Sequence, residues 1–360
     1  MGSTTLAIAV IGGGGLIGKR HCQHVVENPP AHLAAIVDPG PEAIDTARRF
    51  DAPLYATLDE LLDSPHKPDA AVVCTPNHTH VPVGVELARA GVHILCEKPI
   101  SIDCTSAHAL VEEAKKNGVQ LLIGHHRRFN PYMLALKKVV AGGQLGRVIA
   151  VNGLWTTTKP LDYFYGANAW RSNKGSGGPV LINLIHDVDL MHYLFGPITT
   201  VHAEKTLSQR SADTDAVEEG VALIFKFANG IVGTFVVSDN VASPHSFEQG
   251  TGENPNLPMT GADVYRVFGS LGTVSFPDMT LSSYRGVDPS WNNTMASVRM
   301  AVEGKDSAPL ALQLAHFVKV CRGQEAPTCP GQEGLRALAV CNAVRKALDE
   351  GGMANVDMSI

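Results

Sequence analysis

The sequence lacks any excess of positive charge. Its 360 residues carry 29 lysine and arginine side chains against 35 aspartate and glutamate side chains, which gives a formal net charge of -6. A protein that binds nucleic acid or an anionic membrane surface is normally basic over at least one domain. We therefore expect neither nucleic acid nor a membrane as a partner.

Cysteine is scarce and scattered. The seven cysteines are odd in number, and no two of them have the C-x-x-C spacing of a zinc or redox motif. Several fall inside apolar patterns, where cysteine behaves as a small hydrophobic side chain. This usage argues against a disulfide framework and favours a reducing, cytoplasmic environment.

Long apolar runs are absent as well. No stretch approaches the ~18 uninterrupted apolar residues typical of a transmembrane helix. The segment from Met1 to Thr5 lacks the basic region and apolar core of a secretory signal, and Leu6 replaces the serine or threonine of a myristoylation signal. We expect no leader and no membrane attachment.

What the sequence does contain is a large apolar fraction, 44% against 18% charged residues, which is typical of a globular protein with a substantial core. The length suggests two domains. Strand and helix patterns alternate at the start of the chain, and alternating units predict a doubly wound parallel sheet with helices on both faces. We assign this Rossmann-type domain to residues 1–125. The expected strands are 6–11, 33–37, 70–74, 92–96 and 120–123, and the expected helices are 16–27, 42–50, 58–62, 81–90 and 105–117.

The pattern changes after Gly124, and we assign residues 126–360 to a second, α/β domain for substrate binding and oligomerisation. Its strands follow one another with few helices between them, which predicts a mostly antiparallel sheet. The C-terminal helices are candidates for packing back on the first domain. The polar segment 238–261 is long enough to be a lid, a subunit arm or a disordered loop. The expected strands are 148–157, 198–206, 221–227, 231–237, 265–269 and 273–276, and the expected helices are 131–141, 180–194, 310–322 and 333–350.

A glycine-rich turn follows the first strand. Gly13, Gly15 and Gly18 form G-x-G-x-x-G with Leu16 and Ile17 inside it, between a strand and a helix. In this context the glycines allow a tight turn and close backbone approach to a pyrophosphate at the helix N-terminus. The motif predicts a dinucleotide site.

Asp38 ends the second strand, 20 residues after Gly18. This is the expected place for the acid that binds the ribose hydroxyls of NAD. A carboxylate there repels a 2′-phosphate, and the following Pro39-Gly40-Pro41 supplies no arginine to bind one. The sequence therefore favours NAD over NADP.

Two further strand ends carry polar residues. Four of these residues, Thr75, Pro76, Asn77 and His80, follow the strand that ends at Cys74. We expect them to contact the cofactor, although Asn77 also suits a helix cap.

Glu97, Lys98 and Pro99 follow the next strand. Proline disfavours the helical region for the residue before it, so Lys98 is expected in extended backbone beyond the carboxyl end of a parallel strand, where ligands bind. We predict cofactor contacts for Glu97 and Lys98 and a catalytic role for Lys98.

The second domain offers a candidate base. Asn183 and His186 are three residues apart in a helical pattern and share a face. Histidine suits removal of a hydroxyl proton because its ordinary pKa is ~6.5. We predict His186 as catalytic and, together with Asn183, the side chains of Asp187, His126 and Arg171 as substrate contacts. His186 and His192 lie on different helical faces, so we expect no metal site.

These motifs, in this order and spacing, resemble the glucose–fructose oxidoreductase and inositol dehydrogenase superfamily (Gfo/Idh/MocA). The resemblance rests on the glycine turn with His21, Asp38, the segments 75–78 and 97–99, Arg127 to Pro131, and Gly177 to Gly196. It implies an open-faced sheet in the second domain and NAD(P)-dependent oxidation or reduction of a sugar, cyclitol or related polyol. Lys98 and His186 would match the family's active-site lysine and histidine.

One position departs from the family. Many members carry an aspartate four residues before the histidine, where this sequence has Ile182 beside Asn183. A neutral amide can hydrogen-bond a substrate hydroxyl, but it cannot raise the pKa of a neighbouring histidine as a carboxylate would. We therefore do not expect this protein to use the same proton relay as inositol dehydrogenase.

The expected activity is hydride transfer between a secondary alcohol and the nicotinamide, with Lys98 stabilising the alkoxide and His186 accepting the proton. Three alternatives remain open. They are an NAD-dependent glycosidase or lyase that oxidises its substrate transiently, an aldehyde or dihydrodiol dehydrogenase, and a nucleotide-sensing regulator without turnover. Retention of both Lys98 and His186 argues against the regulator.

Two strands of the second domain, Val221–Phe227 and Ile231–Val237, are nearly apolar throughout. A sheet with one face in water should alternate apolar and polar residues. We therefore expect both faces to be covered, one by the protein's own helices and the other by a second subunit. The prediction is a homodimer or a homotetramer.

Overall fold

A computed structural model describes residues 5–210, 217–284 and 286–358. The first four residues, on which the expectation about a leader partly rests, lie outside this range. The chain divides into two units. One contains the residues up to His126 together with Ala308–Leu338, and the other contains Arg127–Ser307 together with the residues from Ala339 onward. The first unit therefore includes a C-terminal segment beyond the predicted boundary near residue 125.

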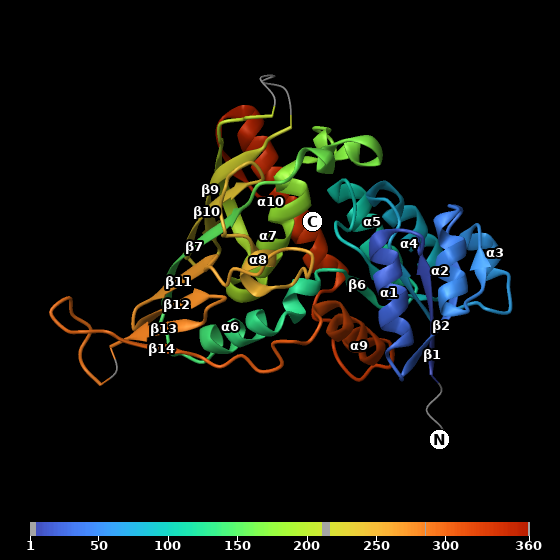
Figure 1. Ribbon diagram of the computed structural model, residues 1–360, viewed down its shortest axis with the longest axis horizontal. Coiled ribbons are helices and arrows are strands. Elements are labelled where there is room, and N and C mark those ends of the chain that lie inside the picture. The colour runs from blue at the N-terminus through green and yellow to red at the C-terminus, as the bar shows by residue number, and fades with distance from the viewer. Residues whose placement is uncertain (1–4, 211–216, 285, 359–360) are drawn as a thin grey trace. The chain divides into compact units, whose positions relative to one another are not determined.

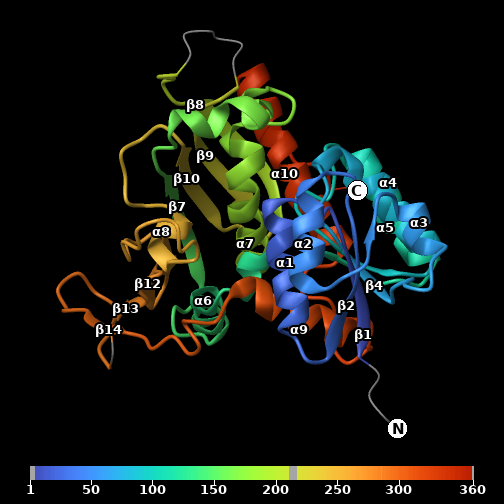
Figure 2. The same cartoon turned by 45° about the vertical axis from the view of Figure 1, so that its right-hand side comes forward.

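The first unit contains a six-stranded parallel sheet in the order β3-β2-β1-β4-β5-β6. Figure 2 labels β1, β2 and β4 of this sheet. The strand order reverses between β1 and β4, as in doubly wound dinucleotide-binding folds. This confirms the predicted fold class. The elements are β1 (Leu6–Ile11), α1 (Leu16–Val26), β2 (Ala31–Val37), α2 (Glu42–Phe50), β3 (Leu54–Tyr55), α3 (Leu58–Leu62), β4 (Ala70–Val73), η1 (Asn77–Thr79), α4 (His80–Arg89), β5 (His93–Cys96), α5 (Cys104–Lys116), β6 (Leu121–Ile123), η2 (His126–Phe129, which crosses the unit boundary) and α9 (Pro309–Cys321).

Local sequence signals explain these elements well. The central strand β4 is buried at all four positions, as a strand covered on both faces should be. Gly91 and Gly118 follow α4 and α5 with φ of 76° and 67°, which is the left-handed conformation that ends a helix. Thr57 and Glu60 form a reciprocal capping box at α3.

The second unit contains a nine-stranded sheet in the order β14-β13-β12-β11-β7-β10-β9-β8-β15. Figure 1 labels the strands of this sheet from β14 to β9. Neighbouring strands are antiparallel except β7 and β10, which run parallel. The elements are α6 (Pro131–Ala141), β7 (Val148–Thr156), η3 (Leu161–Phe164), η4 (Gly166–Ser172), η5 (Val180–Leu184), α7 (Ile185–Phe195), β8 (Ile198–Lys205), β9 (Gly220–Phe227), β10 (Val232–Ser238), α8 (Phe247–Thr251), β11 (Tyr265–Gly269), β12 (Gly272–Phe276), β13 (Thr280–Ser283), β14 (Ala296–Arg299) and β15 (Gly352–Asn355), and α10 (Gly331–Glu350) crosses the unit boundary.

Within this sheet, one face is buried and the other is exposed. Phe225 of β9 and Phe235 of β10 face inward, with ring centroids 5.4 Å apart. On the opposite face Ile224, Val232 and Val236 are 43%, 38% and 37% exposed. The expected loss of alternation therefore needs correction, because burial does alternate along β9 and β10, and the exposed face carries Lys226 and Thr234 among its apolar residues.

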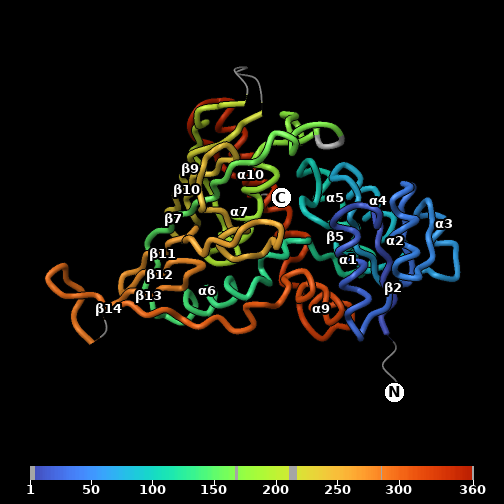
Figure 3. The backbone as a smooth tube through the Cα atoms, in the orientation of Figure 1, coloured from blue at the N-terminus to red at the C-terminus, as the bar shows by residue number. Residues whose placement is uncertain are grey.

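Sequence patterns miss the short and peripheral elements. Figure 3 traces β11, β12, β13 and β14 as successive antiparallel strands at one end of the sheet. The last two were not expected, and neither were β3, β15 and α8. All four residues of β14 are exposed, so no core pattern marks that strand. No helix in the described part of the chain is both long enough and apolar enough to cross a membrane.

Candidate functional site

The glycine turn after β1 has no room for side chains at two of its positions. A Cβ atom added to Gly13 would lie 2.5 Å from Cγ2 of Ile36, and one added to Gly18 would lie 2.1 Å from the carbonyl oxygen of Gly12. Gly15 precedes α1, and no side chain caps the helix there. The backbone at this helix N-terminus is thus bare, as a diphosphate-binding turn requires. Leu16 is 78% exposed, and Ile17 is half-buried.

Asp38 is held at the end of β2 by two backbone groups. Its Oδ2 accepts a hydrogen bond from the Gly14 N–H at 2.8 Å, and its Oδ1 accepts one from the Gly40 N–H, also at 2.8 Å. These contacts join Asp38 to the glycine turn. A carboxylate oxygen has two lone pairs, so each oxygen can also accept a hydrogen bond from a ribose hydroxyl. The residues present fit NAD.

His80 connects the loops that follow β4 and β5. Its Nδ1 lies 2.7 Å from the carbonyl oxygen of Pro99, and its Nε2 lies 2.9 Å from that of Thr75. The ring is buried, and this burial lowers its pKa although the two carbonyls raise it. Both ring nitrogens are engaged, which favours a positioning role over the predicted cofactor contact. Pro76 is exposed and Asn77 is half-buried in the same loop.

Glu97 fixes the backbone where β5 ends. The buried carboxylate lies 2.8 Å from Nε2 of His21 and accepts a hydrogen bond from the Lys98 N–H at 3.2 Å. Burial alone would raise its pKa, but His21, followed by His126 and Lys98, lowers the pKa of Glu97 to about 2. An ionised buried group thus anchors the half-buried Lys98. His126 is half-buried at the start of η2, after β6.

In the second unit, the predicted helix begins with one wide turn. Residues Val180–Leu184 form a π-helix, which continues into α7. Such turns often occur at functional sites. Asn183 lies in this turn and His186 in the first turn of α7, and both are buried.

Asn183 contacts a lysine that the sequence analysis did not select. Nζ of Lys159 donates a hydrogen bond to Oδ1 of Asn183 at 2.7 Å and lies 3.5 Å from Oδ2 of Asp239. Lys159 follows β7 and Asp239 follows β10, the parallel pair, so both lie beyond carboxyl ends of the sheet. The Lys159-Pro160 sequence after an apolar strand repeats the pattern of Lys98-Pro99 and was an available signal.

Arg171 lies against the same region. Its guanidinium is 3.9 Å from the ring centroid of Tyr163, and its Nη1 donates to the Tyr163 carbonyl at 3.0 Å. The backbone near Arg171 packs on Gly177, where an added Cβ would lie 2.0 Å from the Arg171 carbonyl oxygen. Lys159 Nζ is 4.5 Å from the same Tyr163 centroid. Arg171 contacts Tyr163, Tyr163 contacts Lys159, and Lys159 contacts Asn183. These contacts connect two of the predicted substrate-binding residues, Arg171 and Asn183.

Asp187 instead belongs to the interior of the second unit. It is fully buried, and the Tyr265 hydroxyl donates a hydrogen bond to its Oδ1. Burial raises the pKa of Asp187 to about 7, although Arg127 lowers it. This environment favours a structural role over the predicted substrate contact.

Arg127 organises the rest of that interior network. Its guanidinium donates to Glu248 and, at 3.2 Å, to Glu253, and it lies 4.3 Å from the ring centroid of Phe247. Trp155 Nε1 donates to the other oxygen of Glu248 at 2.9 Å. These contacts hold α8 and its flanking residues, which belong to the 238–261 segment, against the rest of the second unit.

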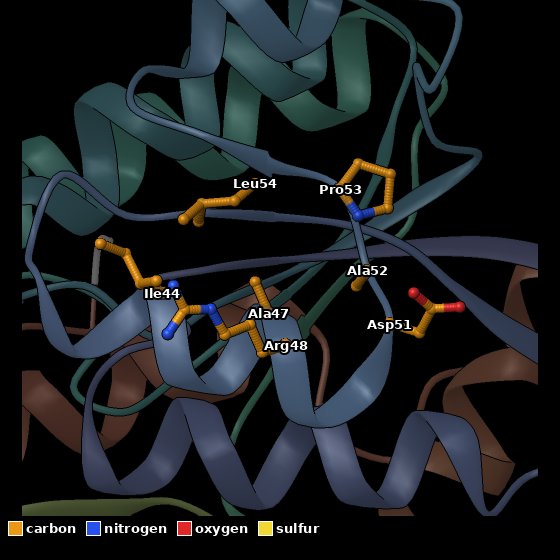
Figure 4. A pocket seen from close by; sticks show the side chains of 7 residues that line it. All are labelled: Ile44, Ala47, Arg48, Asp51, Ala52, Pro53 and Leu54. Carbon is orange, nitrogen blue, oxygen red and sulfur yellow. The ribbon is translucent and has the colours of Figure 1, made fainter.

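The surface of the first unit has a hollow that lies apart from the candidate site residues. A shallow hollow of about 480 Å³ lies beside α2 and β3 (Figure 4). Its lining contains none of the predicted site residues. It is formed by Ile44, Ala47, Arg48, Asp51, Ala52, Pro53 and Leu54.

Among residues 5–210, 217–284 and 286–358, no group of three His, Cys, Asp or Glu side chains is arranged to hold a metal ion.

Comparison with known families agrees with this geometry. Residues 6–125 match the model of an oxidoreductase family with an NAD-binding Rossmann fold, and residues 137–357 match that family's C-terminal alpha/beta domain. The chain belongs to this oxidoreductase family.

Similar proteins include two curated dehydrogenases and a solved structure. Myo-inositol 2-dehydrogenase of Thermotoga maritima is 26% identical over 96% of this chain and 97% of its own length. Levoglucosan dehydrogenase of Pseudarthrobacter phenanthrenivorans is 27% identical over 65% of this chain and 68% of its own length. The crystal structure of a putative myo-inositol dehydrogenase from Sinorhizobium meliloti superposes with a TM-score of 0.74 at 25% identity, covering 98% of this chain and 100% of that one.

Proposed function

We propose that this family member is an NAD-dependent dehydrogenase that oxidises a secondary alcohol of a sugar, a cyclitol or a related polyol. The observation that carries the proposal is the end of β5, where the buried, ionised Glu97 fixes the backbone of Lys98. A lysine held beyond a parallel strand of a dinucleotide-binding sheet is placed for chemistry beside the cofactor. The activities of the related inositol and levoglucosan dehydrogenases support the substrate class.

The cofactor would be held by the glycine turn and by Asp38. The bare N-terminus of α1 suits the diphosphate, and the Asp38 carboxylate suits the ribose hydroxyls while repelling a 2′-phosphate. Thr75 and Asn77 are further candidates for cofactor contacts, and His80 would position their loop. When bound, NAD supplies the acceptor for the hydride that leaves the carbinol carbon.

Lys98 and His186 would act on the substrate oxygen in two different ways. The Lys98 ammonium would stabilise negative charge as it develops on the substrate oxygen, and His186 would accept the hydroxyl proton. Asn183 would orient a neighbouring hydroxyl without acting as a base. His126 stays a candidate substrate contact.

The test is a substrate screen with nicotinamide absorbance as the readout. The protein is incubated with NAD and a panel of polyols, sugars and sugar acids, beside Lys98→Met and the control Lys116→Met, a change to an exposed lysine on α5. NADH formation that Lys98→Met abolishes and Lys116→Met retains is the expected result. Elimination products without net NADH would replace the proposal with the lyase alternative. Failure to bind NAD would refute it.

We also propose that the chain forms a homodimer or a homotetramer through the outer face of its nine-stranded sheet. Ile224, Val232 and Val236 are exposed apolar side chains on this face, interrupted by Lys226 and Thr234, and their exposure to water is costly. A monomeric mass by light scattering at micromolar concentration would refute assembly. The free cysteines favour a cytoplasmic location.

A further inference from the structure

We propose that the substrate carries a carboxylate and that Lys159 and Arg171 form the subsite that binds it. The inference rests on the proposed function and narrows it from neutral polyols to sugar acids. Lys159 and Arg171 are cations on separate segments that converge on one aromatic ring, Tyr163. Asn183, three residues before the candidate base, contacts Lys159 directly.

Lys159 is placed in the subsite by several contacts. Its backbone N–H donates to the Asp239 carbonyl at 2.9 Å, which continues the pairing of β7 and β10 beyond their ends. Its side chain is only 10% exposed, and its Nζ lies 5.2 Å from the Trp155 ring centroid. An ammonium has three donors, of which Asn183 and Asp239 use two. One donor stays available for a ligand oxygen.

Acidic side chains surround Lys159 as well as a second cation. Asp239 lies beside Lys159, and its Oδ1 also lies 2.6 Å from Nη1 of Arg210. Nε of Arg210 lies 4.0 Å from Oε1 of Glu219, so two carboxylates face these two cations. Burial lowers the pKa of Lys159 to about 8, and the charges of Asp239 and Glu248 raise it. The feature that a ligand carboxylate would engage is therefore the third donor of the ammonium.

Arg171 is the second cation of the proposed subsite. In the described part of the chain its contacts are to the Tyr163 carbonyl and to the Tyr163 and Trp170 rings, and no carboxylate pairs with it. A guanidinium presents five donors in a planar fork that matches a carboxylate. Both cationic groups lie within 4.5 Å of the Tyr163 centroid, so they are at most about 9 Å apart. A sugar acid whose carboxylate and adjacent hydroxyls span that distance would satisfy both.

The subsite also lies close in the chain to the candidate base. Asn183 is in the π turn that leads into α7, and its Oδ1 is occupied by Lys159. Its amide nitrogen remains as a donor to a substrate oxygen. A sugar acid would offer a carboxylate oxygen to the third donor of Lys159, whereas a neutral polyol would offer only a hydroxyl, which makes a weaker hydrogen bond to a cation.

Matched pairs of ligands test this assignment. Binding of D-glucuronate and D-galacturonate to the NADH-loaded protein is compared by calorimetry with binding of D-glucose and D-galactose, and rates with NAD are measured for the same four compounds. We expect the wild type to prefer each acid over its neutral partner by about tenfold or more, as a charged hydrogen bond implies. Lys159→Met should reduce that ratio at least tenfold, and the preference should weaken with added salt. Lys159→Arg should retain most of it.

Two further variants make the result interpretable. Arg171→Gln should also lower the acid-to-neutral ratio, which covers the case in which Lys159→Met fails to fold, while Lys116→Met should leave the ratio unchanged. Equal binding of acids and neutral sugars by the wild type, or an unaltered ratio in both Lys159→Met and Arg171→Gln, would overturn the carboxylate subsite. Selective binding of an acid without NADH formation would support the subsite and count against the proposed dehydrogenase activity.

Discussion

Replacing Asp187 with asparagine should change stability with opposite signs at low and high pH. The carboxyl group is fully buried in the second unit, where its Oδ1 accepts the Tyr265 hydroxyl hydrogen bond and its Oδ2 accepts none. Burial raises its pKa from 3.8 to about 7. The native state therefore keeps a proton on this group that the unfolded chain releases.

The sign follows from proton linkage. Below pH 3.8 both states are protonated and Asp187 costs nothing. Between pH 3.8 and about 7 the unfolded state loses its proton first, so the free energy of unfolding falls as pH rises. Above pH 7 the loss is complete and amounts to about 4 kcal/mol, at roughly 1.4 kcal/mol for each pKa unit. Asparagine is neutral at every pH and removes this loss.

Asparagine has a cost of its own. Its oxygen can still accept the Tyr265 hydroxyl, but its amide nitrogen replaces an oxygen that has no hydrogen-bond partner. An unsatisfied buried donor costs about 1–3 kcal/mol. At pH 4.5 the unfolded carboxyl is already mostly ionised, so Asp187 itself costs about 1 kcal/mol there. Asp187→Asn should therefore destabilise the protein by at most about 2 kcal/mol near pH 4.5 and stabilise it by about 1–3 kcal/mol near pH 8.

The assay is urea unfolding followed by tryptophan fluorescence between pH 4.5 and pH 8.5. All three tryptophans, Trp155, Trp170 and Trp291, belong to the second unit, so the signal reports on the unit that contains Asp187. The matched control is Asp189→Asn, which leaves Arg128 without its buried, bidentate partner. Breaking such a pair should cost about 3–5 kcal/mol near neutral pH. If Asp187→Asn behaves like this control and destabilises most at pH 8, Asp187 is an ionised partner of Arg127 and the reasoning fails.

Four other substitutions test the cofactor, the chemistry and the assembly. Asp38→Ser should narrow the preference for NAD over NADP in a binding titration, and equal or tighter NADP binding by the wild type would contradict the role of the carboxylate. Lys98→Ala should lower turnover by about 10²–10⁴-fold with NAD affinity largely retained, as measured by steady-state kinetics and cofactor titration. His186→Ala should lose a similar factor, and its residual rate should rise with pH as solvent accepts the proton. Ile224→Glu should convert the assembly to monomers in light scattering while the thermal melt stays cooperative; an unchanged mass would exclude this face as the interface.

The sequence by itself determined the features that depend on neighbouring residues. Alternating strand and helix patterns predicted the parallel sheet, and the spacing of Gly13, Gly15 and Gly18 predicted the bare turn before α1. Lys98 was identifiable because an apolar strand precedes it and a proline follows it in the sequence. These signals are local, since they follow from backbone sterics and hydrophobic periodicity over a few residues.

Only the tertiary structure decided which distant polar groups meet. Lys159 reaches Asp239 because β7 and β10 run parallel, and no periodicity in the sequence specifies which strands pair. The Tyr265 hydroxyl donates to Asp187, 78 residues before it, and no local pattern in the sequence indicates this buried contact. Such contacts depend on strand order and burial, because a charge is stable inside a protein only where the fold supplies its partner. The sequence thus identified the candidate chemistry, and the fold determined the surroundings of each group.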